Sequence, residues 1–363
     1  MNLKNIFLII LYFNKVSFSY IISKRIDNKP QLNSELNLEL QSQLQSQKKN
    51  YIYPFNFAEK KNNEKKLINK ISYKKRNFAK LIRANNILPT LLLNFTGGWI
   101  ANPSLYNLFH STPFIISSLT TILIMCSSMI INDILDINID KINYPNKPLV
   151  NGSISIKEAY SYLFILLSLT ELLSLKYFPK KMQFIINLSI LNIILYTPIF
   201  KRITFIKNIS CAFLVSCSVI FSSLGSNINL TKNKELLSIL YSTLFYGSFY
   251  NELLLDICDK DGDKRNNIPT IPVIYGNKFS INFLLIMTNI VLLVNTFFLQ
   301  KLYNFKIALL FPIIFFQLLL NLINIKKNNY SKLLIINYVK NTNSSLFLLL
   351  FYICSLATFT MKK

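Results

Sequence analysis

Two acidic clusters are the residues of this chain best suited to chemistry. They read Asn132-Asp133-Ile-Leu-Asp136-Ile-Asn-Ile-Asp140 and Asp256-Ile-Cys-Asp259-Lys-Asp261-Gly-Asp263. Each cluster follows a long apolar run, and carboxylates beside a bilayer are costly and usually functional. The chain has only 16 acidic residues against 40 Lys and Arg. This grouping of scarce acids predicts a site for a positively charged ligand.

The side chains within each cluster recur at helical spacing. Asn132, Asp136 and Asp140 are four residues apart, which places them on one helical face. Asp256, Asp259 and Asp263 follow the same rule at spacings of three and four. Stacked carboxylates repel one another unless a cation lies between them. Oxygen ligands without histidine or thiolate favour Mg²⁺, which usually shares its coordination with substrate phosphate.

The elements that must position these clusters are membrane-spanning helices. Hydrophobic residues make up 52% of the 363-residue chain, and charged residues only 15%. Apolar runs of about 20 residues, long enough to cross a bilayer, recur with little sign of a polar face. We therefore expect an all-α, polytopic membrane helical bundle with about nine transmembrane helices. The expected spans are 84–101, 113–133, 159–178, 184–200, 209–225, 236–255, 281–300, 305–325 and 344–360.

The order of these spans predicts which connections meet. Connections after even-numbered spans lie on one face of the membrane, so both acidic clusters should lie beside Lys201 and Arg202. Those two cations would bind the negative charge of a phosphorylated ligand. More lysines fall on this face than on the other, which by the positive-inside rule makes it cytosolic, or the equivalent face within an organelle.

The first part of the chain differs from the rest. A short apolar core at 6–13 resembles the start of a signal peptide, and a polar, then lysine-rich, stretch follows it. Such a composition cannot bury enough apolar surface to order itself. We expect a targeting leader at 1–75 and a transmembrane domain at 76–363. A disordered cytosolic tail is the alternative for the leader.

Composition also excludes several classes of function. The net charge of +24 comes almost entirely from lysine, whereas specific DNA recognition favours arginine, so we expect no nucleic-acid partner. His110 is the only histidine, which excludes a histidine-based metal site or a catalytic triad. The five cysteines form no CxxC pair.

Two acidic faces with Mg²⁺ and a basic residue can hold a diphosphate and stabilise its charge as it leaves. Because the rest of the molecule is an apolar bundle, the other half of the substrate is expected to be a long hydrocarbon. A prenyl diphosphate fits this description. The helices would shield the carbocation from water until a lipophilic acceptor attacks.

At these residues the chain resembles the UbiA superfamily of intramembrane prenyltransferases, over about residues 80–360. The first cluster has the form N-D/Q-x-x-D-x-x-x-D and continues through Lys141-Ile-Asn-Tyr-Pro-Asn-Lys147-Pro148. The second continues through Lys264 to Thr270-Ile-Pro272-Val-Ile-Tyr-Gly276. Tyr196-Thr-Pro-Ile-Phe-Lys201-Arg202 is similar to the family's Y-x-x-x-K-R element with one extra residue. Arg83 and Asn86 resemble its R-P-x-N entry, with Ala84 in place of proline.

The resemblance implies a nine-helix bundle, diphosphate binding through Mg²⁺ and prenyl transfer. It places metal ligands at Asn132, Asp136, Asp140, Asp256, Asp259 and Asp263, with Asp136, Asp140, Asp256 and Asp263 also catalytic. It places diphosphate-binding residues at Arg83, Asn86, Lys141, Lys201, Arg202 and Lys264.

The favoured acceptor is an aromatic quinone or tocopherol precursor such as homogentisate or 4-hydroxybenzoate. Chlorophyllide and a glycerol-phosphate ether lipid are the alternatives. We expect an organelle membrane, preferably that of a plastid, with the mitochondrial inner membrane and the endoplasmic reticulum as alternatives. No obligate protein partner is evident. Outside this class, a cation transporter with acidic ion sites remains open, although transporter acids tend to lie nearer the bilayer midplane. An assembly factor with a degenerate site would be expected to have lost these aspartates.

Overall fold

Helices make up the regular structure throughout the described chain. The computed structural model describes residues 72–227 and 233–360, so nearly all of the expected leader lies outside the described residues. The chain is helical over 72–81. The named elements follow as η1 (Ala84–Asn86), α4 (Ile87–Ala101), α5 (Leu105–His110), α6 (Thr112–Leu135), α7 (Ile137–Asn143), α8 (Ile156–Tyr177), α9 (Lys180–Tyr196), η2 (Phe200–Arg202), α10 (Ile206–Ser226), α11 (Lys234–Arg265), α12 (Ile271–Leu302), α13 (Phe305–Ala308), α14 (Leu310–Lys327) and α15 (Lys332–Thr360).

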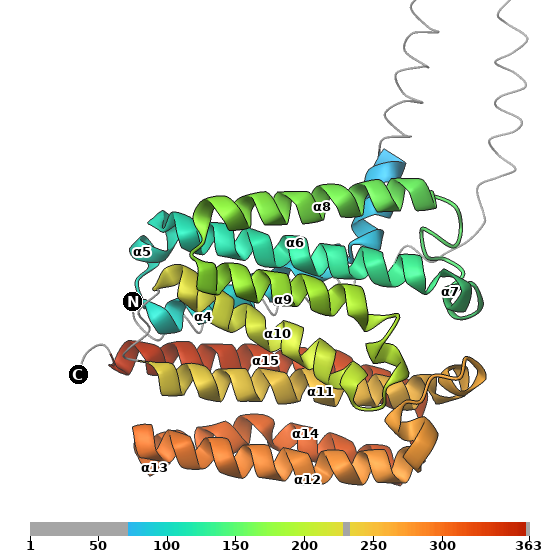
Figure 1. The fold of residues 1–363 in the computed structure, drawn as a ribbon. Coiled ribbons are helices and arrows are strands. Elements are labelled where there is room, and N and C mark those ends of the chain that lie inside the picture. The colour runs from blue at the N-terminus through green and yellow to red at the C-terminus, as the bar shows by residue number, and fades with distance from the viewer. Residues whose placement is uncertain (1–71, 228–232, 361–363) are drawn as a thin grey trace, which may run out of the picture. The chain divides into compact units, whose positions relative to one another are not determined.

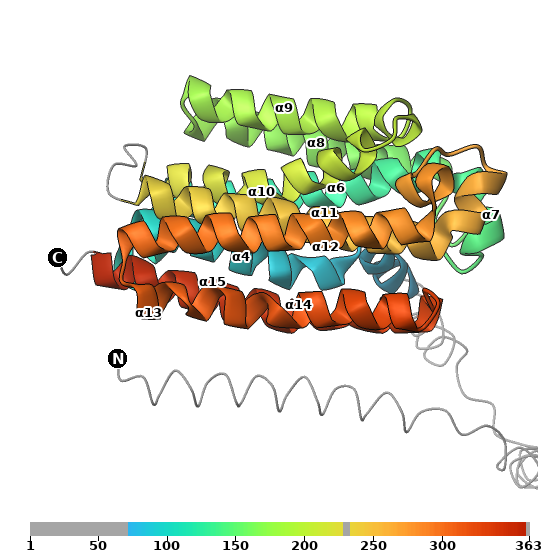
Figure 2. The same ribbon diagram turned by 90° about the horizontal axis from the view of Figure 1, so that it is seen from below.

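The long helices lie side by side with roughly common axes (Figure 1, Figure 2). Helices α6 and α8 pack together along one edge of the bundle, while α12, α13 and α14 form the opposite edge. Helix α10 lies between α4 and α11 and packs on both. The short α7 and the last turns of α11 lie at the same end of the bundle in both views. Both acidic clusters therefore lie at one end of the molecule.

Each expected span overlaps a helix, but the count of nine transmembrane helices is not confirmed. Among the described residues, six helices are long and apolar enough to cross a membrane. They are α6, α8, α10, α12, the joined α13–α14 segment and α15. Helices α4 and α9 have only 15 and 17 residues. Helix α11 is long enough, but its polar side chains lower its hydropathy. The all-α membrane fold is confirmed.

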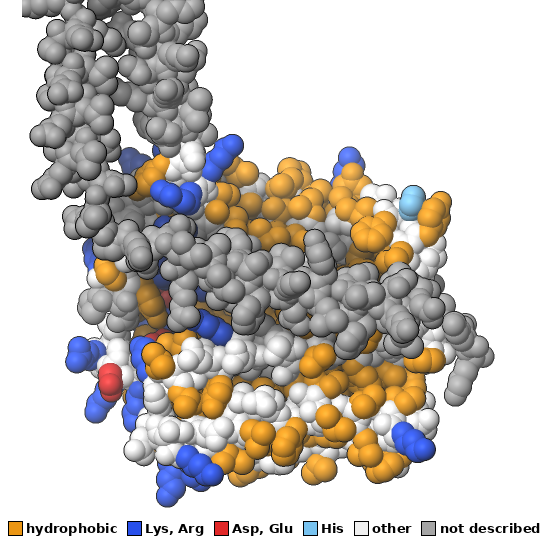
Figure 3. Space-filling view, turned by 180° about the vertical axis from the view of Figure 1, so that it is seen from behind, with side chains coloured by type: hydrophobic (Ala, Val, Ile, Leu, Met, Phe, Trp, Pro, Cys, Tyr) orange, Lys and Arg blue, Asp and Glu red, His pale blue; other side chains and the backbone are white. Residues whose placement is uncertain are grey.

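The outer surface is apolar along the middle of the bundle. Phe164 on α8, Leu293 on α12 and Ile313 on α14 are each more than 60% exposed. Figure 3 shows apolar side chains along the middle of one face, while most of the visible Lys and Arg lie at the end that carries α7. A water-soluble protein rarely exposes so much contiguous apolar surface. The chain is a multi-pass integral membrane protein, and the apolar band faces lipid.

The caps of α6 and α8, and the loop between α7 and α8, fix the position of the first acidic cluster. Ser111 caps α6, and its hydroxyl accepts a hydrogen bond from the Phe114 amide at 3.4 Å. Ser155 and Glu158 form a reciprocal capping box at the start of α8. Between α7 and α8, the chain turns through a loop that contains Pro145 and Pro148. Proline ends a helix, and the loop returns to the cluster, where Lys147 pairs with Asp133 and Asp140.

Close packing of α4 against α10 depends on Gly97. A Cβ atom at this position would lie 2.4 Å from the Val219 carbonyl oxygen and 2.3 Å from the Ser222 Oγ. Backbone atoms cannot move as freely as side-chain ends, so α4 and α10 would have to separate. Small residues allow membrane helices to approach in this way, because van der Waals packing drives their association.

We predict that Gly97→Ala lowers the free energy of unfolding by roughly 1–3 kcal/mol, the usual cost of overpacking. Gly247→Ala is the matched control, because a Cβ there meets nothing within 4 Å. The control should be neutral or stabilising by up to about 1 kcal/mol, since alanine favours a helix. Thermal unfolding of both variants in detergent measures the difference. Equal stability of the two variants would contradict the packing described here.

Candidate active site

The first acidic cluster keeps its helical stacking across a helix junction. Asp136 joins α6 to α7, with φ −92° and ψ 8°. Its amide donates to the Asn132 carbonyl at 2.9 Å, and the Asp140 amide donates to the Asp136 carbonyl at 2.9 Å. The expected spacing of Asn132, Asp136 and Asp140 is therefore retained. Asp136 and Asp140 are both buried.

Lys147, on the loop after α7, neutralises two carboxylates of this cluster. Its Nζ lies 2.9 Å from Asp133 Oδ1 and 2.6 Å from Asp140 Oδ2. Arg83 approaches the same Asp133 oxygen, with Nη2 at 3.7 Å. Burial raises the pKa of Asp140, and the hydrogen bond from Lys147 opposes this rise. Two cations therefore converge on Asp133 from distant parts of the chain.

Lys201 supplies a third cation to the first cluster. Its Nζ lies 2.6 Å from Asp136 Oδ2, which confirms the expectation that this lysine meets the acidic face. Nearby, the Thr197 hydroxyl donates to Asn132 Oδ1 at 3.4 Å. Arg202 lies in the same short helix, η2, but it is exposed and forms no ion pair with any described residue. Of the two expected basic residues, only Lys201 reaches an aspartate.

The second cluster forms the last turns of α11 and its members differ in surroundings. Asp256 is buried, and its carboxylate accepts hydrogen bonds from Lys207 and Asn208 at the start of α10. The Asp259 side chain is 46% exposed and lies 3.5 Å from Lys332. Asp263 is different again, because its buried Oδ2 has no hydrogen-bond partner among the described residues. Burial raises the pKa of Asp263 to about 6.

Electrostatic contacts show that the two clusters are close. Burial raises the pKa of Asp263, and the charges of Lys207 and, to a smaller extent, Lys201 oppose this rise. Lys201 also pairs with Asp136 of the first cluster. Burial raises the pKa of Tyr144, and the charge of Asp259 raises it further. Tyr144 directly follows α7, so each cluster lies within electrostatic range of residues from the other.

The segment 197–208 connects the two clusters physically. It carries Lys201 to Asp136 on one side and Lys207 to Asp256 on the other. The Thr204 hydroxyl donates to the Pro269 carbonyl at 2.7 Å, which ties this segment to the turn after α11. Phe205 has a positive φ of 69°, a conformation that bulky residues rarely adopt. We call 197–208 the bridging segment.

Besides Arg202, three further expected diphosphate-binding residues lie outside this network of ion pairs. Asn86 is exposed where α4 begins, and its backbone carbonyl accepts the Thr90 hydroxyl. Lys141 is exposed and lies 3.5 Å from Asn138 Oδ1. Lys264 is also exposed and pairs with no described acid. Their expected contact with diphosphate stays a prediction.

The structure brings four residues into the site that were not predicted from the sequence as site residues. They are Asp133, Lys147, Lys207 and Asn208. Asp133 and Lys147 both belong to the motif that runs from Asn132 to Pro148, so this motif could have indicated their place in the site. No local pattern marked Lys207 and Asn208, because their position depends on the path of the bridging segment.

The donor set is suitable for Mg²⁺. Within residues 72–227 and 233–360, no group of three or more His, Cys, Asp or Glu is already arranged around a metal position. Mg²⁺ commonly uses one or two carboxylates and completes its coordination with water and substrate phosphate, so a closed protein cage is not required. The carboxylates supply oxygen ligands, and Asp263 Oδ2 has lone pairs that no hydrogen bond from a described residue occupies. These residues fit a magnesium ion.

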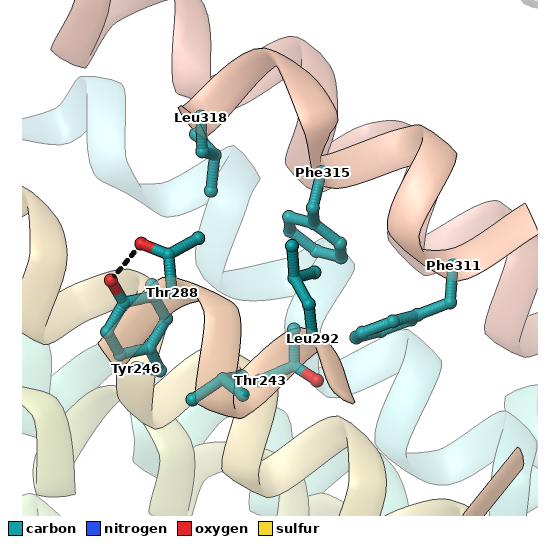
Figure 4. A pocket seen from close by; sticks show the side chains of 9 residues that line it. Thr243, Tyr246, Thr288, Leu292, Phe311, Phe315 and Leu318 are labelled. Atoms are coloured by element: carbon teal, nitrogen blue, oxygen red, sulfur yellow. Dashed lines mark hydrogen bonds between the residues drawn. The ribbon is translucent and has the colours of Figure 1, made fainter. Parts of the chain in front are cut away.

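A small cavity between α11, α12 and α14 is not the substrate pocket (Figure 4). It has about 20 Å³ of free volume, which suits a single water molecule rather than a prenyl chain. Leu292, Phe311, Phe315 and Leu318 line it, and Tyr246 is hydrogen-bonded to Thr288 at its wall. Tyr246 precedes Asp256 by about 15 Å along α11.

We predict that Lys147→Met lowers the free energy of unfolding of the metal-free protein by roughly 1–3 kcal/mol, because two buried carboxylates lose their partner. Lys141→Met, on adjacent α7, removes an exposed lysine and should change stability by less than about 0.5 kcal/mol. Heating followed by size-exclusion chromatography in EDTA measures both. Equal midpoints for the two variants would show that Lys147 does not neutralise the cluster.

Comparison with known proteins identifies similar sequences and folds. A model of the UbiA prenyltransferase family matches residues 90–337. The digeranylgeranylglyceryl phosphate synthase of Methanococcus aeolicus is 31% identical over 199 residues, which cover 55% of this chain and 68% of that protein. The synthase of the same name from Sulfurisphaera tokodaii is 27% identical over 249 residues, covering 68% of this chain and 86% of the relative.

Solved structures share the fold. A structure of a digeranylgeranylglyceryl phosphate synthase superposes with a TM-score of 0.58 at 23% identity, covering 78% of this chain and 98% of that one. A UbiA homolog from Archaeoglobus fulgidus bound to DMAPP and Mg²⁺ gives a TM-score of 0.57 at 19% identity, covering 78% of this chain and 99% of its own. At these identities, the structural likeness concerns the fold alone.

Proposed function

Because the chain belongs to the UbiA prenyltransferase family, we propose that it transfers a long-chain prenyl group from a prenyl diphosphate to a hydroxyl group of a glycerol-phosphate ether lipid. One observation carries this acceptor: the similar relatives described above are digeranylgeranylglyceryl phosphate synthases. The chain itself is a multi-pass membrane prenyltransferase. Its all-helical fold and apolar outer surface suit substrates that are themselves lipids.

This proposal replaces the acceptor and the location favoured by the sequence. An aromatic quinone or tocopherol precursor in a plastid membrane was the first expectation, with the ether lipid as an alternative. The relatives are archaeal ether-lipid synthases, so they favour the alternative and do not support a quinone acceptor or a plastid. Membership of a prenyltransferase family also removes the reason to consider a cation transporter.

The proposed reaction exchanges one carbon–oxygen bond for another. The bond between C1 of the prenyl chain and the diphosphate oxygen breaks, and its electron pair leaves with the diphosphate. The acceptor hydroxyl oxygen forms the new bond to C1, and its proton passes to the released diphosphate, so that the products are the ether and a protonated diphosphate. Because the diphosphate leaves with additional negative charge, cationic groups placed at its oxygens lower the barrier.

The acidic clusters would hold this leaving group through metal ions. Side-chain oxygens of Asn132, Asp136 and Asp140 on the first cluster, and of Asp259 and Asp263 on the second, are the proposed ligands. When bound, Mg²⁺ neutralises diphosphate charge and orients the leaving group. The unpartnered, buried Asp263 Oδ2 is the observation within this chain that best supports a ligand role.

Basic side chains complete the proposed site. Lys201 pairs with Asp136, and its charge also acts on Asp263, which supports a role for this lysine in binding diphosphate oxygens. Arg83 and Lys147 both approach Asp133. The Arg83 side chain is 45% exposed, so its remaining nitrogens are available to a second anion such as the acceptor phosphate. A phosphorylated acceptor would therefore find a cation beside the reaction centre.

We predict that Asp263→Asn lowers kcat/KM for prenyl transfer roughly 10²-fold or more, as loss of a group that stabilises the leaving charge commonly does. Asp261→Asn is the matched control, because Asp261 is an exposed residue of the same turn. The control should retain nearly full activity. Purified protein in lipid nanodiscs with Mg²⁺ and radiolabelled geranylgeranyl diphosphate provides the assay.

The acceptor is tested in the same assay with a panel. Geranylgeranylglyceryl phosphate should be prenylated, while homogentisate, 4-hydroxybenzoate and chlorophyllide should not. Transfer to an aromatic acceptor or chlorophyllide, but not to the glycerol phosphate, would overturn the proposed acceptor.

A further inference from the structure

The second acidic cluster contains two kinds of aspartate. Both carboxylate oxygens of Asp256 accept hydrogen bonds from other side chains of the protein. Asp259 has only an exposed contact with Lys332, and Asp263 Oδ2 has no partner among the described residues. We propose that Asp256 is a positioning residue rather than a metal ligand: with Lys207 and Asn208, it fixes the bridging segment against α11. This inference rests on the proposed function, because it concerns how the same reaction centre is held.

Both oxygens of the Asp256 carboxylate already accept a hydrogen bond from the protein. Oδ1 accepts a hydrogen bond from the Lys207 ammonium, and Oδ2 accepts one from the Asn208 amide at 2.8 Å. The Asp256 side chain is 4% exposed and that of Lys207 is 12% exposed. A metal ion at this carboxylate would lie beside the buried Lys207 ammonium, and the repulsion between the two positive charges, or the loss of the buried ion pair, is strongly unfavourable. The charge of Asp256 is already neutralised.

Asp259 and Asp263 offer what Asp256 lacks. They are four residues apart, so they lie one above the other on the same helical face. Asp259 has only an exposed contact of 3.5 Å with Lys332, and such a pair contributes little. Asp263 Oδ2 is buried without a partner among the described residues. Exchanging these weak or missing contacts for a cation requires no buried ion pair to break.

The ion pair also explains how a strained backbone persists. Phe205 has φ 69°, a costly conformation for a bulky residue that survives only where its surroundings fix it. Lys207 and Asn208, two and three residues further on, are held by Asp256. The Phe205 ring packs edge-on against Phe283, with centroids 5.8 Å apart. Phe283 therefore restrains the strained residue itself, and Asp256 restrains the chain just after it.

The contacts of Asp256 also affect the first acidic cluster, through Lys201. Lys201 stands in the same bridging segment, six residues before Lys207, and pairs with Asp136. If the segment is released from Asp256, the position of Lys201 beside Asp136 is no longer fixed from that side. Asp256 thus acts on the diphosphate site through Lys201, without contact with the substrate.

A double-mutant cycle tests this role in the full-length protein. The variants are Asp256→Asn, Lys207→Met and the charge-balanced Lys207→Met/Asp256→Asn pair, with Asp263→Asn as the reference for loss of a metal ligand. Two readouts are measured for each. The first is the thermal midpoint of unfolding in EDTA. For the second, Mg²⁺ is titrated in the presence of geranylgeranyl thiolodiphosphate, an unreactive substrate analogue that should raise the thermal midpoint. The readout is the Mg²⁺ concentration that gives half of the maximal rise.

We expect each single variant to lower the metal-free midpoint by roughly 5 °C or more, and the double variant to recover at least half of that loss. The half-saturating Mg²⁺ concentration of Lys207→Met and of the double variant should rise by no more than about twofold, because a less fixed Lys201 weakens diphosphate binding without removing a ligand, whereas Asp263→Asn should raise it about tenfold or more. If Lys207→Met fails to fold, the charge-balanced double variant still gives the comparison.

Two results would overturn the positioning role. One is an absence of coupling in EDTA, with the losses of the single variants simply adding. The other is a double variant whose Mg²⁺ requirement rises as much as that of Asp263→Asn, which would make Asp256 a ligand. Failure of the parent protein to prenylate any acceptor would instead overturn the proposed function, since the metal-free coupling does not depend on turnover.

Discussion

Neutralisation of buried carboxylates is the constraint on which this structure depends. A buried aspartate at the end of a membrane helix is costly to keep charged unless a cation lies nearby, because desolvation penalises the charged form. The chain meets this requirement with single lysines brought from connecting segments: Lys147 reaches Asp133 and Asp140, Lys201 reaches Asp136, and Lys207 reaches Asp256. Each connection is thereby attached to a helix that carries an acidic cluster. The ion pairs that offset the cost of burying these charged carboxylates also bring the parts of the site together.

The helical scaffold serves this arrangement. Helix α10 packs closely on α4 and α11, with Gly97 allowing the approach on one side, so its first turn holds a fixed position beside Asp256. The α7 segment and the last turns of α11 lie at one end of the bundle (Figure 1, Figure 2). Polar chemistry is confined to that end, while apolar side chains cover the lipid-facing middle. A reaction between a lipid diphosphate and a lipid acceptor needs this combination.

Much of this organisation was predictable from the sequence, and the reasons are local. The spacing of Asn132, Asp136 and Asp140 predicted a shared face because a helix repeats every 3.6 residues, and the backbone hydrogen bonds retain it. The order of spans placed Lys201 beside the acids. The partners Lys207 and Asn208 were not predictable, because the path of 197–208 depends on the positive φ of Phe205 and on packing against Phe283. The count of nine spans went further than the described helices support, since α4 and α9 are short and α11 is polar.

The central claim is that both clusters hold one metal–diphosphate group between them. Crystals of the protein with Mn²⁺ and geranylgeranyl thiolodiphosphate would test it directly, because the anomalous signal of Mn²⁺ locates the metal without reference to activity. We expect anomalous peaks between the two clusters, with oxygen ligands from Asp136 or Asp140 on one side and from Asp259 or Asp263 on the other, and with the diphosphate bridging them. Peaks confined to one cluster, or metal ions bound away from the diphosphate, would contradict it.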